Sequence, residues 1–391
     1  MLNNFEFMLP TTIRCGRGIH REIGKELAAR GKKKPLLVTD KGLIAAGVID
    51  KITASLAESG YPHIDIFDEV EPNPRDTTVH RGCERARAAG ADALLAVGGG
   101  SSMDTAKGIG VLLAGGGAIK DYEGLGKVTA EIPMLIAAPT TVGTGSEVTF
   151  WAVIKDTKEN YKMSIGSPLI APKLAFLDAD LIETLPPAVI AATGMDALTH
   201  AIEGYTATLS EPLTDACGLY AIEMIGKNLL SAVYGADPKA KENMLIASMV
   251  AGVCFGNSDI GGCHCMSEAL GSLYDTPHGI ANAVMLPYIM EYNCLADTAK
   301  FARVAAALGA RDTAGLSERE SARAAVDCVR RLNQDLAIPS LREIGAKAED
   351  IDELAMRSAT NVSVDSNTRK IGKAEFLSIF RSAMADGPPR A

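Results

Sequence analysis

Short apolar runs alternate with amphipathic helical patterns through the first half of this sequence, and the alternation ends near Leu185-Pro186-Pro187. Four runs are candidate strands, the last with the weakest pattern: 35–39, 93–97, 134–138 and 174–177. Helical patterns lie between them, for example at 77–89 and 102–113. Buried strands joined by helices pair in parallel, with helices covering both faces of the sheet. The first half therefore predicts an α/β domain with a Rossmann-like parallel sheet.

The second half is rich in Ala, Leu, Met and Glu and has few β-branched runs, which favours helices. Four segments carry the clearest helical patterns: 188–206, 213–230, 240–255 and 317–332. A chain of 391 residues is too long for one compact core. We therefore expect two domains, an α/β domain over residues 1–187 and an all-helical domain over 188–391.

Charge and apolar patterning exclude several classes of partner. The formal net charge is -9 at pH 7, and an acidic chain repels phosphate backbones, so nucleic acid is not an expected partner. Residues 1–10 carry no signal-peptide pattern, and apolar stretches such as 109–114 are far shorter than a membrane span. We expect a cytoplasmic protein, not bound to membranes, whose eight cysteines are reduced thiols.

A glycine-rich loop at 98–102 (GGGSS) follows a predicted strand and opens a predicted helix that carries Asp104 and Lys107. Glycines let the backbone approach a phosphate closely, and free N–H groups at the helix start hold the anion. The alternative is a turn that uses glycine for steric reasons only. The pattern is not G-x-G-x-x-G, so the standard Rossmann fingerprint does not apply.

Two further features of the first half suit a dinucleotide. The segment 139–149 (PTTVGTGSEVT) places hydroxyls and glycines after a predicted strand, where open α/β sheets bind ligands. Asp40 ends the strand at 35–39, where its carboxylate can accept hydrogen bonds from a ribose and would repel a 2'-phosphate. That arrangement favours NAD over NADP. A polar capping loop and an Asp that caps the next turn are the alternatives.

Three of the six histidines have partners at metal-ligand spacing. Asp196 and His200 are four residues apart in a helical pattern, which places both side chains on one face. His264 lies in another helical pattern, and His278 follows Pro277, where that helix must already have ended, so we expect a loop there. Three imidazoles and a carboxylate suit Fe(II) or Zn(II) and are poor ligands for magnesium or calcium.

The remaining histidines and two cysteines are interpreted as structural. His20, His63 and His80 have no acidic or histidine partner at ligand spacing. Cys263 and Cys265 flank His264 and raise the possibility of zinc binding. Neighbours in a helix point in different directions, however, so these cysteines are interpreted as small buried thiols.

These segments together resemble the iron-containing (group III) alcohol dehydrogenases, from Leu9-Pro10 to about Arg369. The resemblance is carried by 98–107 (GGGSSMDTAK), 139–149, 194–203 with His264, and 274–282 (YDTPHGIAN). It implies an N-terminal NAD-binding domain and an all-helical metal-binding, catalytic domain, in a fold of the dehydroquinate-synthase type. It also implies NAD(H) and Fe2+ as cofactors, with Zn2+ as the alternative metal, a small alcohol or aldehyde as substrate, and a homodimer or larger homo-oligomer.

The resemblance also implies roles for individual residues. The implied metal ligands are Asp196, His200, His264 and His278. The catalytic residues expected are His264 and His278, which the resemblance implies, and Glu268, which follows His264 by one helical turn. The residues implied to bind the cofactor are Asp40, Asn73, Gly98, Gly99, Gly100, Ser101, Ser102, Asp104, Thr140, Thr141, Thr144, Thr149 and Lys162. For Lys162 the alternative is an ordinary surface lysine.

The sequence departs from the family pattern at two positions. Glu268 stands where the family often has the second histidine of H-x-x-x-H-x-L-G. Because it follows His264 by four residues, it should face the metal, where it can relay protons, bind a polar substrate group or add a ligand. A salt bridge at the edge of the site is the alternative. Trp151, the only tryptophan, replaces a smaller polar residue of some relatives and either narrows the pocket or fills core.

Hydride transfer between NAD(H) and a small alcohol or aldehyde, with the metal as Lewis acid, is the function that these residues favour. An NAD-using, zinc-dependent lyase or cyclase of the dehydroquinate-synthase type is the alternative enzyme class. A nucleotide-binding scaffold would leave the three-histidine cluster without a role.

Overall fold

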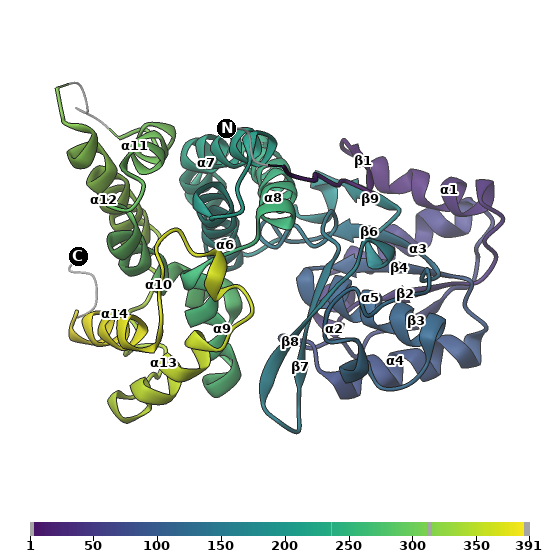
Figure 1. The fold of residues 1–391 in the computed structure, drawn as a ribbon. Coiled ribbons are helices and arrows are strands. Elements are labelled where there is room, and N and C mark those ends of the chain that lie inside the picture. The colour runs from purple at the N-terminus through teal and green to yellow at the C-terminus, as the bar shows by residue number, and fades with distance from the viewer. Residues whose placement is uncertain (1–3, 236, 311–314, 387–391) are drawn as a thin grey trace. The chain divides into compact units, whose positions relative to one another are not determined.

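The computed structural model describes residues 4–235, 237–310 and 315–386, and these residues form two compact units (Figure 1). The first unit consists of residues 9–141 and 145–185. The second consists of residues 4–8 and 142–144 and of the described part of the chain from Pro186 onward. No sequence pattern indicated that the segment 142–144 belongs to the second unit.

The first unit is built on a six-stranded sheet, whose strands run in the order β1-β9-β6-β4-β2-β3 with every pair parallel. The strands are β1 (Thr12–Cys15), β2 (Pro35–Val38), β3 (Asp65–Phe67), β4 (Ala93–Gly98), β6 (Met134–Pro139) and β9 (Leu174–Leu177). The predicted parallel α/β architecture is confirmed, and all four predicted strands are present. The edge strands β1 and β3 were not predicted, because they are short and partly exposed.

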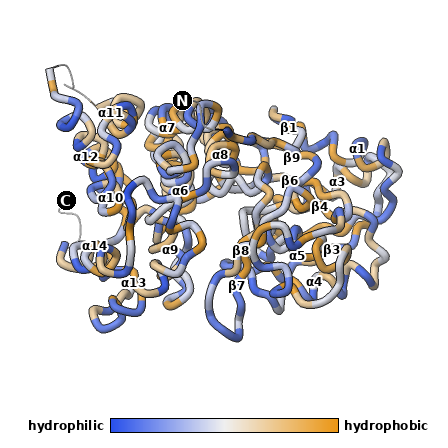
Figure 2. The backbone as a smooth tube through the Cα atoms, in the orientation of Figure 1, coloured by the Kyte–Doolittle hydropathy of each residue, from blue (hydrophilic) through white to orange (hydrophobic). Residues whose placement is uncertain are grey.

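Two apolar cores cover the two faces of this sheet. On one face, α4 (Asp76–Ala89) and α5 (Gly100–Gly115) pack against alternate residues such as Leu36 and Val38 of β2. On the other face, α1 (Ile23–Ala29) and α3 (Val48–Glu58) pack against Leu37. Successive residues of a strand point to opposite faces, so a strand that is buried on both faces is apolar throughout. Figure 2 shows the apolar character of β4 and β6.

A smaller sheet lies on the α5 side of the same unit. It has the order β5-β8-β7 and consists of β5 (Gly124–Leu125), β7 (Trp151–Asp156) and β8 (Tyr161–Gly166). Strands β7 and β8 form an antiparallel hairpin, and Ile154 and Met163 join the core of α5. The remaining short elements are α2 (Lys41–Ala45), η1 (Ile19–Glu22), η2 (Ile119–Tyr122), η3 (Pro168–Ile170) and η4 (Ala179–Leu181).

The second unit is helical, as predicted. Its helices are α6 (Pro187–Thr206), α7 (Pro212–Tyr234), α8 (Pro238–Ser258), α9 (Gly262–Tyr274), α10 (His278–Asn293), α11 (Thr298–Ala307), α12 (Glu318–Asp335), α13 (Ile351–Ala359) and α14 (Lys373–Ala385), with the short η5 (Ala348–Asp350) and η6 (Val364–Ser366). Helices α6, α7 and α8 each begin with a proline, which is pre-organised for the first helical position. Helix α6 packs against α7, α8 and α10 and is buried on all sides from Gly194 to Thr206.

No single helix among the described residues is long and apolar enough to cross a membrane. One pair, Lys239–Ser258 with Gly262–Tyr274, meets the length and composition requirement only when its two helices are taken together across a bend of 102°.

Candidate metal centre and cofactor-binding segments

Four side chains of the helical unit place one ligand atom each within 4.8 Å of one another: Asp196, His200, His264 and His278. Asp196 and His200 stand one turn apart on α6, His264 lies on α9 and His278 on α10. The first three are buried, while the His278 side chain is 29% exposed. The structure thus brings together the four residues that the sequence selected as metal ligands.

His278 is the first residue of α10, and the expectation that it lies in a loop was wrong. Helix α9 ends at Tyr274, and Asp275 adopts the left-handed conformation with φ 56. Pro277 then serves as the N-cap residue of α10. Proline has no backbone N–H, but at the start of a helix that N–H would have no carbonyl partner within the helix. A proline at this boundary therefore does not disfavour the helix that follows.

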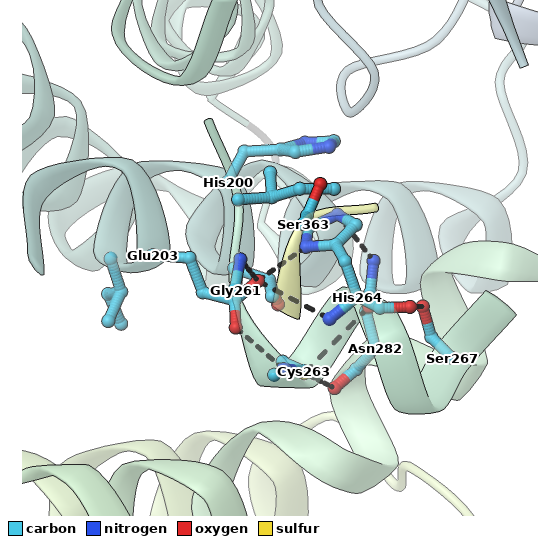
Figure 3. A network of polar contacts seen from close by, with 12 residues as sticks. His200, Glu203, Gly261, Cys263, His264, Ser267, Asn282 and Ser363 are labelled. Atoms are coloured by element: carbon cyan, nitrogen blue, oxygen red, sulfur yellow. Dashed lines mark hydrogen bonds and ion pairs between the residues drawn. The ribbon is translucent and has the colours of Figure 1, made fainter. Parts of the chain in front are cut away.

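Glu203 is a residue of the site that the sequence interpretation missed. Its buried carboxylate accepts hydrogen bonds from the backbone N–H groups of Gly261 (3.0 Å), Cys263 (2.6 Å) and His264 (3.3 Å), and from His264 Nδ1 (2.6 Å) (Figure 3). It therefore satisfies the N–H groups at the start of α9, where a negative charge is favourable. The signal was present, because residues 196, 200 and 203 repeat at the spacing of one helical face.

Glu203 also fixes the ring of His264. When Nδ1 donates to the carboxylate, the lone pair of Nε2 is directed into the cluster, and Asn282 Nδ2 donates to that Nε2 at 3.1 Å. Burial alone would lower the pKa of His264, but the hydrogen bond and charge of Glu203 outweigh it and raise the pKa. A histidine oriented by a carboxylate in this way is a more basic metal ligand.

Asn282 is the second residue that the interpretation missed, although it follows His278 by one helical turn. Its amide nitrogen lies 2.7 Å from Asp196 Oδ1, 3.1 Å from His264 Nε2 and 3.3 Å from His278 Nε2. Lone pairs of three candidate ligands therefore converge on one positively polarised atom. Acceptors arranged in this way also suit a bound cation.

The charge states of His200 and Asp196 also suit a bound metal ion. His200 stacks on Phe255 with ring centroids 4.1 Å apart, and its Nδ1 lies 3.2 Å from the carbonyl oxygen of Gly143. Burial lowers the pKa of His200 to about 4, so the ring is neutral at pH 7 and can offer Nε2. Burial would raise the pKa of Asp196, but the three histidines and Asn282 outweigh it and lower the pKa. One carboxylate with three imidazoles is a donor set that fits Fe(II) or Zn(II).

The cysteines beside His264 are not part of the cluster. Burial raises the thiol pKa of Cys263 and of Cys265 well above the ordinary value, which disfavours the thiolate that binds metals. Cys263 Sγ instead lies 3.4 Å from the carbonyl oxygen of Asn282. None of the eight cysteines, all of which lie among the described residues, forms a disulfide.

In the α/β unit, the glycine-rich loop connects β4 directly to α5. A Cβ atom on Gly98 would lie 2.2 Å from Ser102 Oγ, so only glycine fits there. Gly99 is the N-cap residue of α5, and no side chain caps this end of the helix. Gly100, Ser101 and the buried Ser102 form the first turn. The N–H groups of this turn are suited to an anion.

The second segment lies beside the first, because β4 and β6 are neighbours. Thr140 donates its backbone N–H to the Gly98 carbonyl oxygen at 3.0 Å, and the side chain of Thr141 lies against Gly99. Thr144, in contrast, belongs to the helical unit. Lys162 lies on β8 opposite Lys155 of β7.

Asp40 and Asn73 are held by local structure. Asp40 is the N-cap residue of α2, where Oδ1 accepts the Leu43 N–H at 3.0 Å, so the capping alternative is observed for one of its oxygens. Asn73 is buried in the connection between β3 and α4 and has a positive φ of 54.

Asp104 and Lys107 fasten α5 to the segment that leads into β7. Asp104 accepts hydrogen bonds from Ser146 Oγ (2.7 Å) and the Val153 N–H (3.0 Å), so both of its oxygens are used within the protein. Lys107 is fully buried, and its Nζ donates to the Ser146 carbonyl oxygen at 2.8 Å and to the Trp151 carbonyl oxygen at 2.6 Å. Nζ also lies 3.3 Å from Thr149 Oγ1. Burial lowers the pKa of Lys107 to about 8.

Trp151 packs within the small sheet. It stands opposite Gly166 of β8, where an added Cβ atom would lie 2.4 Å from its ring. The glycine therefore makes room for the indole, and Trp151 reports on the folding of the α/β unit.

Glu147 gives this unit a pH-dependent stability. It is 2% exposed, its Oε1 has no hydrogen-bond partner among the described residues, and burial raises its pKa from 4.5 to about 7. Between these two values the native state holds a proton that the unfolded chain releases, so stability falls as the pH rises. At about 1.4 kcal/mol per pKa unit, the loss is about 3 kcal/mol.

Glu147→Gln is expected to remove this loss. The check is urea unfolding followed by Trp151 fluorescence at about pH 5 and about pH 7.5. The exposed Glu159→Gln serves as the matched control and should keep the dependence of the native protein. Equal pH dependence in both variants would contradict a buried, protonated Glu147.

Comparison with known proteins gives matches along nearly the whole chain. The sequence model described as iron-containing alcohol dehydrogenase matches residues 10–179, and that described as Fe-containing alcohol dehydrogenase family, C-terminal, matches residues 190–384. A 1,3-propanediol dehydrogenase of Citrobacter freundii is 41% identical over 383 residues, which cover 97% of this chain and 98% of that protein. A choline dehydrogenase of Bacillus subtilis (strain 168) is 41% identical over 379 residues, covering 96% and 94%.

Solved structures show the same fold. The crystal structure of a 1,3-propanediol oxidoreductase matches with a TM-score of 0.93 and 40% identity, covering 97% of this chain and 100% of the other. A sulfoacetaldehyde reductase from Bifidobacterium kashiwanohense, in complex with NAD+, matches with a TM-score of 0.86 and 28% identity, covering 98% and 100%.

Proposed function

This chain belongs to the iron-containing alcohol dehydrogenase family, and from that premise we propose that it transfers a hydride between NAD(H) and a small alcohol or aldehyde, using one divalent metal ion. The observation that carries the proposal is the cluster of Asp196, His200, His264 and His278, whose ligand atoms lie within 4.8 Å of one another. Three of these groups direct their acceptor atoms toward one amide nitrogen, and acceptors that face a common region are what a cation requires.

These four side chains would hold Fe2+ or Zn2+, and the donor set alone favours neither strongly. When bound, the metal would supply Lewis-acid stabilisation of negative charge on the substrate oxygen, and NAD(H) would supply or accept the hydride. Asp196 contributes the one negative charge among the ligands. Glu203 holds the His264 ring and so keeps Nε2 directed into the cluster.

The α/β unit would bind the dinucleotide. The first turn of α5 offers uncapped N–H groups to the pyrophosphate, and Gly98 and Gly99 let the backbone come close to it. Asp40 would accept the ribose hydroxyls, and Lys107 holds the segment that carries Thr149. A similar protein solved in complex with NAD+ supports this cofactor. Asn73, Thr140, Thr141, Thr144 and Lys162 belong to the same proposed set by resemblance.

The proposed substrate class, oligomeric state and cellular location of this chain are based on its family. Relatives include a 1,3-propanediol dehydrogenase, a choline dehydrogenase and a lactaldehyde reductase of Escherichia coli, whose names all refer to small alcohols or aldehydes. We extend that substrate class to this chain, together with a cytoplasmic location and a homodimer or larger homo-oligomer. The lyase or cyclase alternative is not favoured, because these relatives are dehydrogenases and reductases.

The test is net turnover of the cofactor. With an aldehyde such as propanal, the protein should consume NADH in proportion to the alcohol formed, followed by absorbance and product analysis. A lyase of the dehydroquinate-synthase type returns its NAD to the starting state, so product formation without net NADH loss would overturn the proposal.

Asp40→Gly is expected to raise the use of NADPH. The change removes a carboxylate that would repel a 2'-phosphate, and that repulsion contributes on the order of 10-fold or more to the NAD preference. The check is the ratio of kcat/KM for NADPH to that for NADH. Because Asp40 also caps α2, Asp40→Asn serves as control: it keeps a cap and loses only the charge. An unchanged ratio in both variants would contradict the ribose role of Asp40.

A further inference from the structure

Glu268 is a buried carboxylate beside the metal cluster, and the proposed chemistry leaves it without a role. It follows His264 by one turn of α9, so both side chains lie on the same face of that helix. It is 7% exposed. It lies outside the group of four ligand atoms within 4.8 Å of one another, so this arrangement does not make it a fifth ligand.

One of its partners is Asn361, which reaches it from the segment between α13 and α14. Asn361 Nδ2 donates to Glu268 Oε2 at 2.6 Å. Asn361 Oδ1 in turn accepts the Ser363 N–H at 2.9 Å. The hydrogen bond from Ser363 identifies which atom of the Asn361 amide is the oxygen, because only the oxygen can accept from a backbone N–H. Glu268 Oε2 therefore faces a donor and acts as an acceptor.

The Asn361 segment is itself fixed to the helices of the cluster. Ser363 Oγ and Ser366 Oγ donate to Asp259, at the end of α8, at 2.8 Å and 2.5 Å. Asn367 Oδ1 accepts the N–H of Gly262, the first residue of α9, at 3.1 Å. The segment that carries Asn361 is therefore tied to the end of α8 and, through Asn367, to the first residue of α9, the helix that carries His264.

This arrangement disfavours a proton relay through Asn361. The contact runs from a carboxylate through an amide to a backbone N–H, and an amide side chain does not readily pass a proton on. A carboxylate with two oxygens can nevertheless accept several hydrogen bonds, about four in all, so the bond from Asn361 does not exhaust it.

We propose that Glu268, held by Asn361, selects the substrate: it binds a substituent that donates a hydrogen bond or carries positive charge, and it excludes an anionic one. The preferred substrates are then small aldehydes and alcohols that bear a second hydroxyl or an ammonium group near the reacting carbon. This inference rests on the proposed dehydrogenase function and names the substrate class for it.

The physical basis is the strength of a hydrogen bond or an ion pair between a substrate group and a buried carboxylate. A hydrogen bond to a charged group is worth about 1.5–3 kcal/mol, and a site built to bind a hydroxyl rejects the analogue that lacks one. The preference should therefore be on the order of 10-fold or more in kcat/KM. A carboxylate on the substrate would meet like charge and should bind worst.

The experiment compares substrates of equal shape. One pair is 3-hydroxypropanal and butanal, in which a hydroxyl replaces a methyl group. The other pair is betaine aldehyde and 3,3-dimethylbutanal, in which a cationic nitrogen replaces a neutral carbon. Succinic semialdehyde supplies the anion. The holoenzyme is assayed with NADH, and the readout is the ratio of kcat/KM within each pair.

Two variants separate the hydroxyl from the charge. Glu268→Gln keeps an acceptor oxygen but no charge, so it should lose most of the preference for betaine aldehyde and keep part of the preference for 3-hydroxypropanal. Glu268→Met should lose both preferences and accept succinic semialdehyde better. The exposed Glu223→Gln, on α7, is the matched control and should keep the native ratios. Metal content and circular dichroism verify that each variant is folded and loaded.

Each result has a defined meaning. A native preference of about 10-fold within either pair, lost in Glu268→Met, supports the proposal and identifies which group is bound. Turnover of all aldehydes without such a preference, or a preference that survives in Glu268→Met, overturns the role of Glu268 and leaves the dehydrogenase function standing. No NADH consumption with any of these aldehydes would overturn the proposed function, and this inference with it.

Discussion

His264→Ala is expected to lower kcat/KM for aldehyde reduction by about 1000-fold or more, because it removes one of the four proposed metal ligands and Lewis-acid stabilisation is worth several kcal/mol. The variant should also bind metal poorly. Beyond the lost ligand, it leaves Glu203 without its histidine partner, although the carboxylate keeps three backbone N–H groups. Steady-state kinetics and metal analysis of the purified variant provide the check.

Two controls make the His264 result specific. NADH binding, followed by its fluorescence, should persist, because the proposed dinucleotide contacts are made mainly by residues of the α/β unit. His63→Ala replaces an exposed histidine that we interpret as structural, and it should keep native activity. Full activity in His264→Ala would mean that the three histidines and Asp196 form no catalytic metal centre.

Glu203→Ala is expected to be nearly as damaging, by two separate routes. It leaves three backbone N–H groups at the start of α9 without their acceptor, and buried donors without a partner cost about 1–3 kcal/mol each. It also releases the ring of His264, and the loss of such a supporting carboxylate typically costs about 10–100-fold in metal affinity or activity. We therefore expect a loss of about 3 kcal/mol or more in unfolding free energy, together with weaker metal binding.

A second buried glutamate of the same unit separates these two effects. Glu211 caps α7 by accepting the Leu213 and Thr214 N–H groups, both at 2.9 Å, and it is not a ligand or a partner of the cluster. Glu211→Ala should cost about 0.5–2 kcal/mol of stability and leave metal affinity unchanged. Equal metal affinity in Glu203→Ala and the native protein would show that Glu203 supports only the helix.

The parts of the fold that the sequence predicted are those governed by local patterns. Strands such as β4 are apolar throughout because both faces are covered, and α6 and α7 are long and begin at prolines. The hairpin of β7 and β8 was missed because its strands carry polar residues such as Lys155 and Lys162 in alternation. The segment 142–144 groups with the second unit through contacts distant in sequence, such as that of Gly143 with His200, which no local pattern indicates.

The residues of the candidate site likewise fall into those that local patterns predict and those that they do not. Asp196 and His200 could be paired from their spacing alone, His264 and His278 were grouped with them as the remaining histidines of the second half, and the family resemblance supported the set. The supporting residues could not be assigned roles so directly, because their contacts join distant parts of the chain. Glu203 reaches His264 across 61 residues, and Asn361 reaches Glu268 across 93. Pairings of this kind depend on how helices pack, which no local pattern encodes.

The most direct test of a metal-dependent, NAD-linked dehydrogenase is NADH absorbance over time with a small aldehyde, using protein stripped of metal. Three samples are compared, one reloaded anaerobically with Fe(II), one reloaded with Zn(II) and one left without metal. We predict NADH consumption only in a reloaded sample, and the more active of the two identifies the working metal. Equal NADH consumption in the metal-free sample would contradict the metal centre, and no consumption in any sample would contradict the dehydrogenase itself.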